Sequence, residues 1–134
     1  MGAFNVEKDI RDYLTNTTGL SNVTTGMLAP SPKIQYAVVE YPGPSSTKTH
    51  GGSSSQATIA LDNAMIQIAA RHTATETART NILAVVDALD GLSNVTVNSV
   101  VYTYIEMVAR PRLHERAEDG TVTFIAEFRV QARR

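Results

Sequence analysis

The chain has 134 residues, of which 43% are hydrophobic and 19% charged, the size and composition of one globular domain with its own core. A net charge of −1 excludes the strong positive potential of a general nucleic-acid binder. The lack of cysteine excludes disulfides, thiolate catalysis and cysteine-ligated metals.

The first half of the chain predicts a helix, a connection and a strand. Between residues 3 and 16, Val6, Ile10 and Leu14 recur on one helical face, and Gly19 is suited to end that helix. Residues 20–33 are small or polar and predict a connection, with room for a short edge strand near Met27. Residues 34–41 are β-branched and aromatic, and the prolines that follow them end a predicted strand.

A long loop is predicted at residues 42–58. From position 45 to position 58, eight of fourteen residues are Ser or Thr, and Gly51-Gly52 lies in the middle. Such a composition buries too little apolar area to offset the entropy of ordering, so we expect a mobile loop within one domain that spans residues 1–134.

The second half predicts a strand, a helix and a hairpin. Residues 64–71 form the strand, and Thr73 with Glu76 predicts a capping box that starts a helix ending at Gly91. The buried stripe of this helix is predicted to be Ala78, Ile82, Val85, Val86 and Leu89. Residues 95–97 and 100–109 are strand-like, residues 110–120 predict a turn, and residues 121–131 alternate as a clear strand. The inward face of that last strand is predicted to be Val122, Phe124, Ala126, Phe128 and Val130.

The order of these elements predicts an α+β fold. We expect a two-layer sandwich, in which a mixed sheet of four or five strands carries two helices packed on one face.

No residue pattern indicates catalysis. His50, His72 and His114 lack metal-ligand spacing, and the Gly-Gly-Ser run at positions 51–53 matches neither a nucleophile elbow nor a phosphate loop. We therefore expect no enzyme activity, no cofactor and no metal.

Six of the nine arginines lie in the last twenty-five residues, interspersed with acids. Such a region is either a solvated face or an interface in which arginines meet carboxylates of a neighbouring subunit. Tyr102 and Tyr104 either pack under a helix or contribute to a contact surface. The candidate interface residues are Arg71, Tyr102, Tyr104, Arg110, Arg112, Glu115, Arg116, Glu127 and Arg129.

Several short motifs resemble those of a known family. The strand Met65-Ile66-Gln67-Ile68-Ala69-Ala70-Arg71 leads directly into the helix, Pro111 to Arg116 precede the last strand, and that strand follows Gly120. Over residues 34–131 the layout resembles the tail-terminator (minor capsid, tail-completion) proteins of long-tailed bacteriophages. The chain departs from the family pattern at three places. Family members often have Pro where this chain has Ala64 or Met65, and a second Arg where it has Ala69. The hairpin tip of this chain also lacks the Gly-Arg-Asp run often seen in the family.

This resemblance implies a structural protein of the virion. Such proteins form a ring, usually a hexamer, that caps the finished tail tube, ends its polymerisation and joins tail to head. The implied partners are further copies of the chain, which pair at exposed sheet edges, the tail tube protein and the head–tail connector protein. DNA only passes through the channel, and no membrane is involved. The implied location is the head-proximal end of the tail, with the host cytoplasm as the site of assembly.

The long loop would then dock a tube or connector, with Ser45, Ser46, Lys48, His50 and Ser53 as candidate docking residues. Two alternatives remain open on sequence alone: a head-completion or connector adaptor, and a small-ligand-binding α+β module with its site under this loop.

Overall fold

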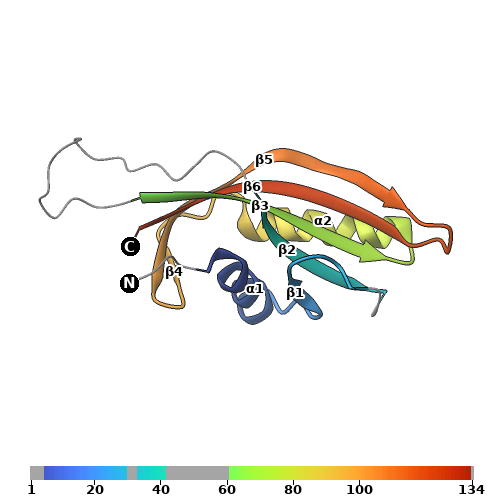
Figure 1. Cartoon of the computed structure of the whole chain (residues 1–134), viewed down its shortest axis with the longest axis horizontal. Helices are drawn as coiled ribbons and strands as arrows, with labels where there is room; N and C mark the ends of the chain where they lie inside the picture. The colour runs from blue at the N-terminus through green and yellow to red at the C-terminus, as the bar shows by residue number, and fades with distance from the viewer. Residues whose placement is uncertain (1–4, 30–32, 42–60, 134) are drawn as a thin grey trace, which may run out of the picture.

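The computed structural model describes residues 5–29, 33–41 and 61–133 (Figure 1). The predicted loop at residues 42–58 and its candidate docking residues lie outside this described part. The elements in chain order are α1 (Val6–Thr17), β1 (Val23–Thr25), β2 (Gln35–Tyr41), β3 (Leu61–His72), α2 (Thr75–Leu89), β4 (Val95–Val97), β5 (Val100–Arg116) and β6 (Val122–Arg133).

The six strands form one mixed sheet in the order β1-β2-β3-β6-β5-β4. β1 pairs in parallel with β2, and all other neighbouring strands are antiparallel. The α+β class and the mixed sheet are confirmed, but the expected four or five strands fall short of the observed six. The predicted edge strand near Met27 lies earlier in the chain, at β1.

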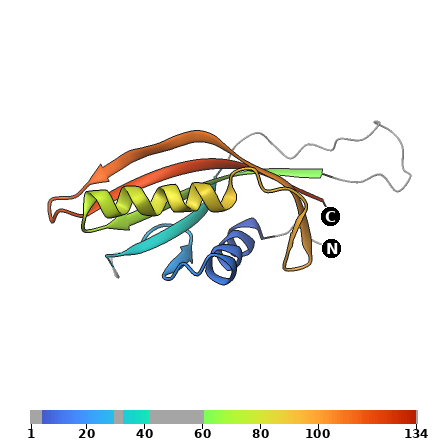
Figure 2. The ribbon, with the colours of Figure 1, turned by 180° about the vertical axis from the view of Figure 1, so that it is seen from behind.

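Both helices cover the same face of the sheet (Figures 1 and 2). The even-numbered residues from Ala64 to Ala70 on β3 and from Val122 to Ala132 on β6 are buried on this face, so the predicted inward set from Val122 to Val130 is confirmed. α2 packs on β3, β6 and β5, whereas α1 packs on β1, β2 and also β4. Because β1 and β4 are the outermost strands, the sheet must curl for one helix to contact both.

α1 is capped at both ends, of which the sequence predicts only the C-terminal one, at Gly19. The Asn5 side-chain oxygen accepts a hydrogen bond from the Lys8 backbone N–H at 3.1 Å. At the other end Gly19 has φ +77°, and the Leu20 N–H donates to the Leu14 carbonyl at 3.3 Å. The side chains of Val6, Ile10 and Leu14 are fully buried, and each contributes about 1.5–3 kcal/mol to folding.

The start of α2 differs from the predicted capping box. Ala74 is the N-cap and makes no side-chain capping bond, so the predicted Thr73–Glu76 box is wrong. His72 Nδ1 instead accepts a hydrogen bond from the Ala74 N–H at 3.0 Å, which satisfies a donor just before the first turn. The predicted buried stripe is confirmed, with Val86 only half-buried.

The hairpin region contains one turn more than the sequence suggested. Asn98 and Ser99 have φ of 51° and 68° and connect β4 to β5, so residues 95–109 form two antiparallel strands. Positive φ at both central residues is the requirement of a type I′ hairpin turn, and Asn tolerates such values better than most residues. β5 then continues to Arg116, so most of the predicted turn at residues 110–120 is strand.

β5 is strongly bulged. The sixteen residues from Val101 to Arg116 lie opposite the twelve from Val122 to Arg133, and the difference is absorbed at four register shifts. Each β-bulge adds an unpaired residue and increases the local twist, so β5 bends relative to its neighbour.

Candidate assembly surface

An apolar groove of about 570 Å³ lies between α2 and the distal half of β5, which we define as Val108 to Arg116. Leu83, Pro111 and Phe124 contribute apolar side chains to it. Leu83 is 47% exposed because it lies beside the buried stripe of α2 and not on it. We name this feature the α2–β5 groove; it is lined by Arg79, Leu83, Ala109, Arg110, Pro111, Arg112 and Phe124.

The outer edge of β5 is covered along its first half and open along its distal half. At the covered end the Ile105 N–H donates to the Leu92 carbonyl at 3.0 Å, and the Met107 N–H donates to Asp90 Oδ1 at 2.8 Å. Beyond Met107, β6 is the only described strand that pairs with β5. Pro111 has no N–H, and the bulges interrupt the remaining ladder. A neighbouring chain would therefore meet this edge through side chains and not through a continuous ladder.

Three arginines surround the groove, and their partners differ. The Arg79 guanidinium lies 5.4 Å from the centre of the Phe124 ring, a cation–π contact. Arg112 Nη2 lies 2.8 Å from Glu127 Oε2, and this hydrogen bond lowers the pKa of the Glu127 carboxyl. Arg110 is exposed and pairs with no carboxylate among the described residues. The groove thus presents cationic side chains around an apolar floor.

A polar ladder crosses the sheet face opposite the helices, which we call the open face. Arg129 Nη1 lies 3.2 Å from Glu106 Oε2, and the Tyr104 hydroxyl donates to the same Glu106 side chain. This hydrogen bond is the main reason why the pKa of the Tyr104 hydroxyl is raised. Next to this pair, Glu127 accepts hydrogen bonds from Arg112 on β5 and from Gln67 on β3, the latter at 3.5 Å. Four candidate interface residues, Tyr104, Arg112, Glu127 and Arg129, therefore lie on neighbouring strands of one face.

The other end of the open face carries a smaller groove of about 390 Å³ that includes Met27, Arg71 and Glu115 in its lining. Arg71 contributes to the fold here, since its Nε donates to the Lys33 carbonyl at 2.8 Å and its Nη2 to the Ala29 carbonyl at 2.5 Å. These bonds hold the connection between β1 and β2 against β3. Arg116 lies away from this groove and reaches Thr75 Oγ1 at 3.4 Å.

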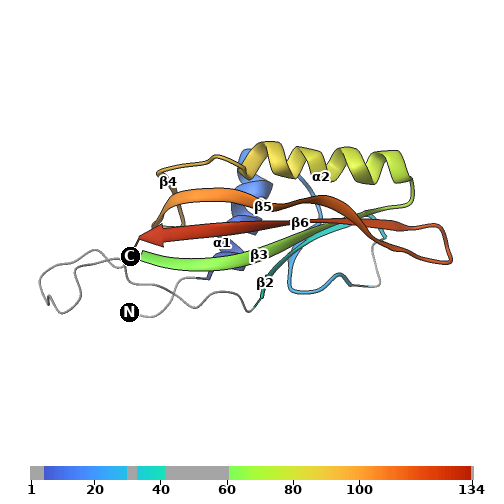
Figure 3. The same cartoon turned by 90° about the horizontal axis from the view of Figure 1, so that it is seen from above.

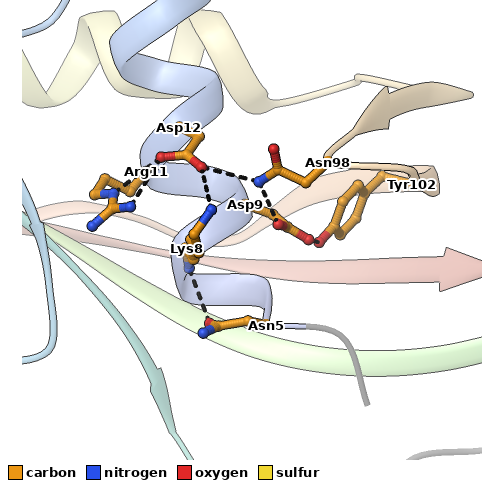
Figure 4. A network of polar contacts seen from close by, with 7 residues as sticks. All are labelled: Asn5, Lys8, Asp9, Arg11, Asp12, Asn98 and Tyr102. Atoms are coloured by element: carbon orange, nitrogen blue, oxygen red, sulfur yellow. Dashed lines mark hydrogen bonds and ion pairs between the residues drawn. The ribbon is translucent and has the colours of Figure 1, made fainter. Parts of the chain in front are cut away.

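Tyr102 is not a surface residue, which corrects its prediction as a contact residue. Its side chain is 0% exposed, and its hydroxyl donates to the buried carboxylate of Asp9 on α1 (Figure 4). Burial, followed by this bond, raises the pKa of the Tyr102 hydroxyl well above its ordinary value. The β4–β5 turn joins the same network, since Asn98 Nδ2 donates to Asp9 at 2.8 Å and to Asp12 at 3.0 Å.

Within the described ranges, no three His, Asp or Glu side chains are grouped so as to hold a metal ion. Neither described helix has the length and apolar character needed to cross a membrane.

Comparison with known proteins identifies the fold. No protein-family model matches the chain, and no curated protein matches its sequence significantly. A solved structure described as the virion of a native gene transfer agent (GTA) particle contains a chain that is 16% identical. The match covers 90% of this chain and 84% of that one, with a TM-score of 0.53. A second solved structure, whose protein has no functional name, is 14% identical over 95% of this chain and 89% of its own, with a TM-score of 0.52. At these identities the likeness establishes a shared fold.

Proposed function

We propose that this chain is a structural protein of a phage-like virion and performs no reaction of its own. The observation that carries the proposal is the fold, which the chain shares over 90% of its length with a protein of a gene transfer agent virion. A shared fold alone does not determine function, so the surface has to support the same conclusion.

The surface supports a role in assembly. Among the described residues, six large hydrophobic side chains are exposed, and five of them fall into two groups. One group lies on α2 and the distal half of β5, and the other lies on the connection between β1 and β2. The first group is Leu83, Val108 and Leu113, and the second is Met27 and Ile34. A ring is built from heterologous contacts, in which two different patches of the same chain meet. Two separate apolar groups on different edges of one sheet satisfy that requirement.

The finer proposal is a tail terminator. In this role, copies of the chain form a ring, most simply a hexamer, on the head-proximal end of the tail tube. The ring ends tube polymerisation and presents a surface to the head–tail connector, while DNA passes through its channel. The motifs between residues 65 and 131 support this choice, and residues 42–58 supply the proposed docking loop. Host cytoplasm is the proposed site of assembly.

Electron microscopy of the purified chain, alone and with assembled tail tubes, tests this proposal. We expect rings, either free or seated at one end of each tube, and tubes that stop growing once capped. Rings that bind a connector and ignore tubes would identify a head-completion adaptor instead. A stable monomer that ignores both and gains thermal stability with a small metabolite would refute the structural role in favour of a ligand-binding module.

A further inference from the structure

We propose that the α2–β5 groove receives the β5–β6 hairpin tip of a second copy of this chain. The tip comprises residues 117–121 and extends beyond the start of α2 (Figure 3). This inference rests on the proposed ring and names the two surfaces that make its contact.

Hydrogen bonds and one ion pair within a single copy hold the conformation of the tip. The Gly120 N–H donates to the Ala117 carbonyl at 3.0 Å, and Gly120 has φ +92°, so the loop is a tight turn followed by a left-handed residue. The Asp119 carboxylate accepts the Thr121 N–H at 3.0 Å and its hydroxyl at 2.7 Å, and it pairs with Lys33 at 2.9 Å. A preformed loop loses little entropy on docking, which favours association.

The charges of the two surfaces are complementary. Glu118 lies at the apex of the tip, is exposed, and makes no hydrogen bond or ion pair with any described residue. Asp119 is paired with Lys33, so Glu118 supplies the unpaired negative charge of the turn. The groove contains three arginines and no acid among its lining residues, and Arg110 in particular has no carboxylate partner in the described part of the chain. An unpaired acid and an unpaired arginine on different parts of one chain complement each other only when two copies meet.

The geometry of the groove selects this occupant over two others. Pro111 and the bulges prevent a regular strand from pairing with the distal half of β5, whereas a turn docks without ladder bonds. The apolar floor formed by Leu83 and Phe124 suits protein better than a phosphate backbone. Because tip and groove are different surfaces, the contact is heterologous and can repeat around a ring.

Charge reversal tests the contact by sedimentation velocity. We expect Arg110→Glu and Glu118→Lys each to weaken self-association about tenfold or more, because like charges then face each other. The double variant, and a 1:1 mixture of the two single variants, should recover association. Arg133→Glu is the matched control, since it makes the same charge change at an exposed site on the other end of the sheet and should associate as the wild type does.

Crosslinking provides a second measurement that does not depend on charge. The native chain has no cysteine, so thiols can be placed without background. A chain carrying both Arg110→Cys and Glu118→Cys should give a ladder of covalent multimers with a short bismaleimide. Each single-cysteine chain should remain monomeric under the same denaturing analysis.

The outcomes separate this inference from the proposed ring. If the wild type assembles but neither the charge variants nor the double-cysteine chain responds, the contact inference is wrong and the ring proposal stands. If the wild type does not associate alone or on tail tubes, both are wrong. If Arg110→Glu abolishes binding of short duplex DNA but leaves self-association unchanged, the groove binds nucleic acid and the inference is overturned.

Discussion

Replacing Tyr102 by Phe removes one hydroxyl from the contact between β5 and α1. That hydroxyl donates to the Asp9 carboxylate, which is 4% exposed and whose other described side-chain donor is Asn98. A hydrogen bond to a charged group contributes about 1.5–3 kcal/mol, and a buried acceptor left without it loses a comparable amount. We therefore expect Tyr102→Phe to lower the free energy of unfolding by about 2 kcal/mol.

Urea unfolding followed by circular dichroism measures this loss. With a slope of about 2 kcal/mol per molar urea, the midpoint should fall by about 1 M while the slope stays constant. Tyr104→Phe is the matched control, because it makes the same chemical change two residues away, where the tyrosine is exposed and its partner Glu106 lies at the surface. The control should shift stability by no more than about 0.5 kcal/mol.

A double-mutant cycle with Asp9→Asn isolates the pair. The coupling free energy should be about 1–3 kcal/mol, since the two groups are in direct contact. Equal losses in Tyr102→Phe and Tyr104→Phe, or additive losses in the cycle, would refute the assignment of this bond as the link between α1 and β5.

Four other expectations can be checked on the same material. Ile82→Asp places a charge in the core and should unfold the domain, with a loss of several kcal/mol in circular dichroism melts, while Thr80→Asp on the exposed face should not. Gly120→Ala should cost about 1 kcal/mol in urea midpoints from backbone strain alone, because φ is +92° and no atom lies within 4 Å of an added Cβ. Hydrogen bonds from the side chains of Asn98 and, second, Lys8 lower the pKa of Asp12 to about 2. The ionised carboxylate therefore stabilises the fold above pH ~4, and this stabilisation is lost as the pH falls from about 4 to 2. The stability difference between wild type and Asp12→Asn, under about 1 kcal/mol at pH 6, should accordingly vanish near pH 2. Deletion of residues 46–55 should leave the circular dichroism spectrum intact and abolish binding to tubes or connectors in pull-down assays; unchanged binding would reduce that segment to a spacer.

The parts of the fold that follow from periodicity could be predicted from the sequence. Residues 122–130 mostly alternate, and the predicted inward residues from Val122 to Val130 are all buried, although Thr123 and Ile125 on the other face are buried as well. The stripe from Ala78 to Leu89 has helical spacing and is buried as expected. In both segments the packing against one apolar surface decides the structure, and the pattern of hydrophobic residues records that packing directly.

The parts that depend on distant contacts could not be predicted. Asn98-Ser99 is a weak turn signal compared with Asn-Gly, so the sequence predicts the strand-like residues on either side of it but not the reversal of the chain between β4 and β5. Residues 110–116 look polar and turn-like, but β6 pairs with them and extends β5 to Arg116. The Asp9–Tyr102 bond joins residues 93 positions apart, and nothing local to either residue marks it.

The candidate surface shows the same division. The concentration of arginines near the C-terminus directed the candidate list to β5 and β6. The structure places six of the nine candidates on the open face: Arg71, Tyr104, Arg112, Glu115, Glu127 and Arg129. The sequence did not indicate Leu83, Phe124 or Arg79 as neighbours of Arg110, because these residues come from α2, β6 and β5 and are brought together only by the tertiary packing of α2 on the sheet. Nothing in the sequence marks Glu118, since its isolation from every described cation is a property of the folded chain.

α1 packs on both outermost strands of the sheet, β1 and β4, and so connects its two edges. A helix near the start of a chain ordinarily frays first, and its amides exchange with solvent through small local openings. Here any opening of α1 would remove its packing from both β1 and β4 and break the bonds from Asn98 and Tyr102 to Asp9. The amides of α1 should therefore exchange with solvent only as fast as the whole domain unfolds. The two edges of the sheet would then lose the cover of α1 in the same event.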